Sequence, residues 1–197
     1  MAAPTRVKTV WFKKEGERPA DEVATAVATT IWRMADRALD NLSKADYDII
    51  TPQRGFKIIA ELTAFAAHYV DRLVYARLPE AQRIALISAL GMRLAETMED
   101  NVLDFTDGVK DPDYDYKKGY IDMLNKRMAE YGHFEFPDGK PGFPAARFLS
   151  LQIREGMEKT DQSWIQDQIM DIEMPEILGT VKKQVDGFYP PLTKTGA

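Results

Sequence analysis

The sequence predicts an all-α protein, organised as a bundle of six to seven helices. The main observation is that apolar residues recur every three to four positions through several long segments, the period of one helix face. Proline, glycine or a capping residue also stands near the ends of these segments. In 197 residues, 45% hydrophobic and 29% charged side chains are ordinary for a single globular domain. We expect at most one short β-hairpin.

Three parts follow from this pattern. We expect an extended arm over residues 1–20, a helical bundle over residues 21–187 and an extended tail over residues 188–197. The first helix is expected to start with Asp21 as its N-cap. Its predicted core face consists of Val23, Val27, Ile31, Met34, Ala38 and Leu42.

Prolines mark the starts of the next two helices. Thr51-Pro52 places a hydroxyl before a proline in the first turn, and Pro79 separates the second predicted helix from the third. The third helix is the most clearly amphipathic. Its predicted core face consists of Ile84, Ile87, Leu90, Gly91, Leu94, Met98, Val102 and Phe105.

An acidic stretch and a segment rich in glycine and proline separate the predicted helices in the second half of the chain. The acidic stretch 106–116 is expected to be a loop before a fourth helix. Glycines and prolines are dense over residues 132–144, which predicts a long ordered loop or a hairpin around Asp138-Gly139. A fifth helix follows over about residues 145–159.

The last helical region is expected to break or kink at Pro175. Before this proline, Ile165, Ile169 and Ile172 share one face. After it, the apolar residues fall on roughly the opposite side when counted at about 100° per residue. Two helices joined at the proline are the simplest explanation.

Composition excludes several classes of function. The chain has no cysteine, so disulfides, thiolate metal sites and cysteine nucleophiles are excluded. A net charge of -5 with scattered basic residues argues against nucleic-acid binding. No apolar run is long enough for a membrane span or a signal peptide. We therefore expect a soluble cytoplasmic protein that binds neither nucleic acid nor membrane.

Polar residues of the second helix form the first candidate site. Glu61 and His68 lie two turns apart, and a carboxylate beside an imidazole can serve as acid and base or as metal ligands. Asp71 would orient the imidazole, and Arg72 or Tyr75 would contact an anionic ligand. The alternative is a solvated or interhelical polar face held by spaced charges.

The acidic stretch is the second candidate. Asp111, Asp113, Asp115 and Asp122 have the spacing of the first, third, fifth and twelfth positions of a calcium-binding loop. Tyr116 replaces the glycine that the sharp turn of such a loop needs. The alternative is an acidic loop in which Asp113 caps the next helix.

Aromatic residues outside the helical periodicity form the third candidate, because interfaces are enriched in such side chains. The alternative is that the arms and loops fold back and bury these rings. The residues expected at an interface are Trp11, Phe12, Trp32, Phe188 and Tyr189.

The absence of recognisable catalytic motifs favours a protein without catalytic activity. We expect it to act through protein–protein contact and to self-associate as a homodimer, without a cofactor. The alternative is a ligand- or metal-binding bundle, possibly an enzyme, that uses Glu61, His68, Asp71 and Arg72 to hold a small molecule.

Overall fold

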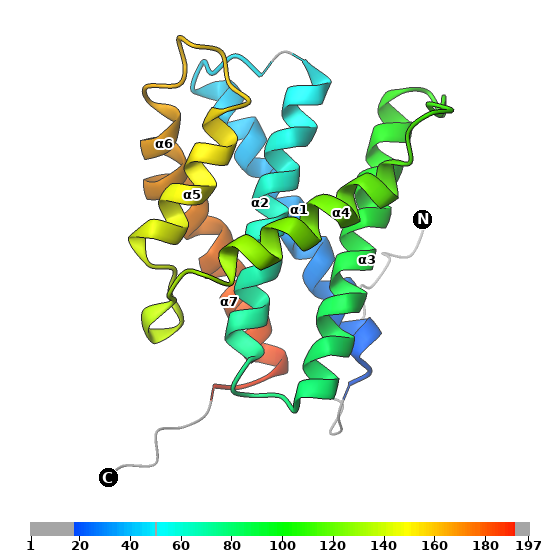
Figure 1. Cartoon of the computed structure of the whole chain (residues 1–197), viewed down its shortest axis with the longest axis vertical. Coiled ribbons are helices and arrows are strands. Elements are labelled where there is room, and N and C mark those ends of the chain that lie inside the picture. The colour runs from blue at the N-terminus through cyan, green and yellow to red at the C-terminus, as the bar shows by residue number, and fades with distance from the viewer. Residues whose placement is uncertain (1–17, 50, 192–197) are drawn as a thin grey trace, which may run out of the picture.

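The computed structural model describes residues 18–49 and 51–191 (Figure 1). All regular elements in these two ranges are helical and no strand is present there, which confirms the all-α prediction. The longer helices are α1 (Ala20–Lys44), α2 (Pro52–Val74), α3 (Glu80–Phe105), α4 (Tyr116–Tyr131), α5 (Phe143–Arg154) and α7 (Met174–Phe188).

Helix α2 is the central helix of the bundle. It packs against α1, α3, α4, α5 and α7, and α4 crosses it obliquely (Figure 1). Every residue from Glu61 to Val70 is buried, so the burial extends around the whole helix. The small side chains of Ala64, Ala66 and Ala67 let neighbouring helices come close. A helix surrounded in this way buries its polar residues as well as its apolar ones.

The apolar face predicted for α1 is confirmed, because all six of its residues are buried. The face predicted for α3 is wrong at both ends. Ile84 is 54% exposed and Phe105 is 60% exposed, whereas Leu86 is buried. Helical spacing gives the direction of a side chain but not whether a neighbouring helix extends far enough to cover it.

The helix starts follow the prolines more closely than the capping side chains. Pro52 opens α2 as predicted, and Pro79 occupies the N-cap position of α3. Helix α1 begins at Ala20, so Asp21 lies in its first turn and is not the N-cap. The Asp21 carboxylate instead pairs with Arg93 of α3 at 3.1 Å. The start of α1 therefore lies beside the middle of α3.

The breaker-rich segment forms no hairpin. Residues Pro137–Gly139 form a short 3-10 helix (η2) instead. The backbone N–H of Gly142 donates to the carbonyl of Glu135, which closes the loop before α5. Gly139 has a φ of +71°, a conformation that side chains other than glycine rarely adopt.

The last helical region is continuous through a π-helical segment. The elements α6 (Ile165–Asp167), η3 (Gln168–Glu173) and α7 follow without a gap. A π-helical turn holds an extra residue, so it shifts the facing of every later side chain. The apolar residues before and after Pro175 therefore face the same core. The same shift exposes Ile172, which was expected inside, and buries Glu173.

The arm and the tail lie mostly outside the described residues, and α7 ends at Phe188, the first residue of the predicted tail. No helix in the described ranges is both long enough and apolar enough to cross a membrane.

Candidate functional site

The structure separates the residues of the predicted α2 site. Glu61 is 3% exposed and accepts hydrogen bonds from Nε and Nη2 of Arg127, at 2.7 and 2.6 Å. Arg127 also donates to Glu130 and Gln152. The hydrogen bond with Glu61 is the main reason why the pKa of Arg127 is raised. Both carboxylate oxygens of Glu61 are therefore used in a buried ion pair between α2 and α4.

Among the residues that the structure describes, His68 lies beside aromatic rings and not beside a carboxylate. Its ring centroid is 5.6 Å from that of Tyr131 and 5.1 Å from that of Phe136. Neither imidazole nitrogen has a hydrogen-bond partner within the described residues, and neither has the Tyr131 hydroxyl. Burial, and then the positive charge of Arg72, lower the pKa of His68 from 6.5 to about 4. The imidazole is therefore neutral at pH 7.

The other three residues of this predicted site lie toward the end of α2. Asp71 accepts hydrogen bonds from Nη1 of Arg83, with distances of 2.9 and 3.1 Å to its two oxygens, and does not orient His68. The guanidinium carbons of Arg72 and Arg83 each lie 4.7 Å from the centre of the Tyr75 ring. These residues form a surface cluster that is separate from the Glu61 ion pair.

The aspartates of the acidic stretch are held by local contacts. Asp111 accepts a hydrogen bond from the backbone N–H of Asp113 at 2.9 Å. Asp115, and not Asp113, caps α4 by accepting from the N–H of Lys118. Asp122 pairs with the Lys118 ammonium at 2.6 Å. In the described part of the chain, no group of three or more His, Cys, Asp or Glu residues is placed to hold a metal ion.

The residues predicted for an interface have different environments. Trp11 and Phe12 lie outside the described residues. Trp32 is half-buried and packs against the core. Phe188 and Tyr189 are also half-buried against the core, and the guanidinium of Arg18 lies 5.6 Å from the centre of the Phe188 ring. Most of the area of these two rings is therefore used within the chain.

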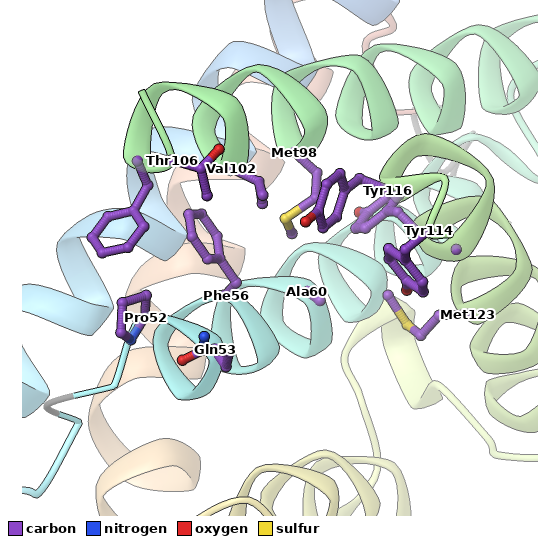
Figure 2. A pocket seen from close by; sticks show the side chains of 13 residues that line it. Pro52, Gln53, Phe56, Ala60, Met98, Val102, Thr106, Tyr114, Tyr116 and Met123 are labelled. Atoms are coloured by element: carbon purple, nitrogen blue, oxygen red, sulfur yellow. The ribbon is translucent and has the colours of Figure 1, made fainter. Parts of the chain in front are cut away.

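A hollow with a volume of about 380 Å³ opens where α2, α3 and α4 meet. We call it the aromatic groove. Figure 2 shows Phe56 of α2 pointing across the gap toward Val102 and Thr106 at the end of α3, and Met98 lines the groove farther along the same helix. Tyr116 and Met123 contribute the side formed by α4. Pockets that hold small ligands have similar volumes and a similar predominance of apolar and aromatic side chains.

Aromatic pairs define the two ends of the aromatic groove. Phe56 and Phe105 meet edge to face, with ring centroids 6.3 Å apart. Tyr114 and Tyr116 pack in the same manner at 5.1 Å. In the interior, the hydroxyl of Tyr120 is 2.8 Å from that of Thr63. The Tyr120 hydroxyl at the floor of the groove therefore already has a hydrogen-bond partner. The exposed rings at the outer edge of the groove are available for contact.

A glycine in the first turn of α4 allows Tyr114 to lie against the helix backbone. A Cβ at Gly119 would be 2.3 Å from the Tyr114 hydroxyl oxygen and 2.8 Å from its Cζ. Real Cβ atoms essentially never come that close to another heavy atom. Tyr114 itself is 53% exposed. Gly119 thus positions a largely exposed aromatic ring at the edge of the groove.

A second hollow, of about 450 Å³, lies on the other side of the Phe56–Phe105 pair. It is bordered by α1, the start of α2 and the end of α3, and Trp32 and Ile49 contribute to its walls. Because Pro52, Phe56 and Phe105 line both hollows, the two form one apolar depression. The exposed Phe105 side chain lines both hollows.

Carboxylates dominate the end of α3 and the loop that follows. Between residues 96 and 115 the only basic residue is Lys110, which pairs with Glu99 at 3.5 Å. The acidic residues in this range are Glu96, Glu99, Asp100, Asp104, Asp107, Asp111, Asp113 and Asp115. Within the described residues, Asp100, Asp104 and Asp107 have no ion-pair or hydrogen-bond partner for their carboxylates. The end of α3 and the loop beside the aromatic groove therefore carry a net negative charge, and Lys117 and Lys118, which follow at the start of α4, pair with Glu96 and Asp122.

Sequence reasoning found some of these residues and missed others. Tyr114 and Tyr116 were noticeable as aromatic residues outside the helical periodicity. Phe56, Met98 and Met123 were missed, because each lies within a regular helical pattern and only the packing of α3 and α4 against α2 brings them together. Phe105 was assigned to the core because it continues the helical spacing of α3, but it is 60% exposed.

The comparisons with known proteins give no family to which the chain can be assigned. No family model matches it, and no curated protein and no solved structure matches it. The function is therefore argued from the geometry and charge of the aromatic groove.

Proposed function

We propose that the protein is a non-catalytic binding protein, which acts through protein–protein contact and accepts an apolar, positively charged segment of a partner in the aromatic groove. The observation that carries this proposal is the combination of exposed aromatic rings with an acidic surround. Phe105 is 60% exposed and Tyr114 is 53% exposed on one side of the molecule. Large apolar side chains that stay exposed together are typical of interaction sites.

The chemistry of the partner follows from the two components of the surface. Phe56, Met98 and Met123 offer an apolar wall, and the flexible methionines adapt to side chains of different shapes. Asp100, Asp104 and Asp107 do not line the groove, but they belong to the end of α3 and its loop, where they attract Lys and Arg and repel acidic segments. A segment that alternates aromatic and basic residues satisfies both requirements.

A catalytic role has less support. Glu61, the predicted acid or base, is engaged by Arg127 through both of its oxygens. His68 is 3% exposed and has no carboxylate partner within the described residues. A general acid or base must reach the proton that it transfers, directly or through one water molecule.

The proposal is tested with two fluorescently labelled peptides that contain the same aromatic residues, one with lysines and one with glutamates between them. Fluorescence anisotropy measures their affinity for the full chain. We expect the lysine peptide to bind with a Kd that is lower by about tenfold or more, a preference that added salt reduces. Equal binding of both peptides at low salt would contradict the proposal.

A matched pair of variants places the binding on the groove. Phe105→Ala removes a ring that is 60% exposed in the groove, and Phe143→Ala removes one that is 66% exposed at the start of α5. We expect Phe105→Ala to weaken binding of the lysine peptide by about tenfold, the loss typical of an aromatic contact residue. Phe143→Ala should leave the Kd unchanged. Identical effects of the two variants would show that the peptide binds elsewhere.

A further inference from the structure

Residues 6–14 have the composition that the aromatic groove requires of its occupant. The first fourteen residues contain four basic side chains, Arg6, Lys8, Lys13 and Lys14, and no acidic ones. Between the basic residues lie the apolar residues Val7, Val10, Trp11 and Phe12. The rest of the chain is strongly acidic, because the net charge of the whole is -5 although this segment is positive.

We propose that residues 6–14 dock in the aromatic groove of the same chain, so that a partner must displace them. This inference rests on the proposed function, because it takes the same groove and identifies a segment that fills it. Trp11 and Phe12 would contact the groove near Phe56 and Phe105, and the lysines would face the carboxylates of α3 and its loop. Residues 6–14 lie outside the described part of the chain, so their charge and composition carry the argument.

The start of α1 places this segment within reach of the groove. Asp21 is bound to Arg93 at 3.1 Å, so the chain leaves α1 beside the middle of α3. Met98 lies five residues farther along α3, a rise of about 8 Å, and Phe105 lies twelve residues farther, a rise of about 18 Å. Residues 13–19 can span up to about 23 Å when extended. The linker is therefore long enough for Trp11 and Phe12 to reach the groove in the same chain.

Docking in the same chain is also favoured by the high effective concentration of a tethered segment. A short linker holds a tethered segment at an effective concentration on the order of millimolar. Even a weak contact between two aromatic rings and an apolar groove is then well populated. Electrostatic attraction adds to this, because the segment is positive and the surround of the groove is negative.

The tryptophans of the chain make a direct test possible. The three tryptophans are Trp11, Trp32 and Trp164, so a Trp32→Phe/Trp164→Phe variant of the full chain carries Trp11 as its only tryptophan. We expect acrylamide to quench Trp11 several-fold less in the native variant than in urea. The protection should not depend on protein concentration. Quenching that is equal in the native and the unfolded variant would overturn the proposal, and so would protection that appears only at high concentration.

Two substitutions in this single-tryptophan background locate the contact. Phe105→Asp puts a charge on the groove, and Phe143→Asp makes the same change at a ring of similar exposure outside it. We expect Phe105→Asp to expose Trp11 to the quencher and Phe143→Asp to leave it protected. Both side chains are largely exposed, so neither substitution disrupts the core, and circular dichroism checks that the helices persist. Equal quenching in the two variants would overturn the proposal.

The labelled lysine peptide separates this inference from the proposed function. If residues 6–14 occupy the groove, a Trp11→Ala/Phe12→Ala variant of the full chain should bind the peptide several-fold more tightly than the unmodified chain does. An unchanged Kd would overturn the docking and leave the groove as a binding site for partners. Failure of the peptide to bind either protein would overturn the groove itself.

Discussion

His68 makes the stability of this protein depend on pH. Its imidazole is 3% exposed between aromatic rings, and burial lowers its pKa from 6.5 to about 4. As the pH falls, the unfolded chain therefore binds a proton at this residue before the folded chain does. The contribution of His68 to stability is complete above pH 6.5 and is lost progressively as the pH falls toward 4.

The size of this loss follows from the difference between the two pKa values. Between pH 7 and pH 5, preferential protonation of the unfolded state lowers the free energy of unfolding by about 2 kcal/mol. The substitution His68→Phe keeps a ring beside Tyr131 and Phe136 and removes the titrating group. We expect its free energy of unfolding to fall by about 2 kcal/mol less over this pH range than that of the unmodified chain.

Urea denaturation followed by circular dichroism at pH 7 and pH 5 measures the effect. All other titrating groups are shared by the two proteins, so the difference between them isolates His68. The matched control is His133→Phe, which removes the only other histidine from an exposed position. This control should retain the pH-dependent loss, because His68 is still present. If the unmodified chain and His68→Phe lost the same stability, the imidazole would not be buried as described.

Three further predictions concern the ion pair, the groove and the oligomeric state. Glu61→Gln should lower the free energy of unfolding by about 3–5 kcal/mol, because it leaves the Arg127 charge buried without its main partner; urea denaturation that shows no loss would contradict a buried ion pair. Gly119→Ala should displace Tyr114 and weaken binding of the lysine peptide, yet raise or preserve the melting temperature, because alanine favours a helix over glycine by about 0.5–1 kcal/mol. We also propose that the protein is a homodimer and that the half-buried Trp32 contributes to the interface with the part of its ring that stays exposed. Light scattering should detect twice the chain mass, and Trp32→Ala should shift the equilibrium toward monomer. A monomer at all concentrations would exclude self-association.

The fold was predictable from the sequence where one helix face meets one core. On α1, the apolar residues predicted for the core face, from Val23 to Leu42, follow helical spacing, and all of them are buried. The spacing could not show that α2 is surrounded by five other helices. Glu61 and His68 were therefore predicted on a polar face, whereas both are 3% exposed. The partner of Glu61, Arg127, is 66 residues away, and no local pattern links the two.

The last helical region shows a different limit of prediction from the sequence. Counting at a fixed angle per residue predicted a change of face at Pro175 and placed Ile172 inside. The π-helical segment from Gln168 to Glu173 adds a residue to the turn, which exposes Ile172 and buries Glu173. A fixed period cannot anticipate such an insertion. The aromatic groove could not be predicted either, because its walls come from helices whose packing order the sequence does not give.

The most direct test of the groove is the response of the methionine methyl groups to the lysine peptide. The chain has nine methionines, of which Met98 and Met123 line the groove, while Met92 lies on α3 with 43% of its surface exposed. In a methyl-labelled sample, NMR should show the largest shifts at Met98 and Met123 and little change at Met92. Shifts that are largest at Met92, or spread evenly over the methionines, would contradict a binding site between α2, α3 and α4.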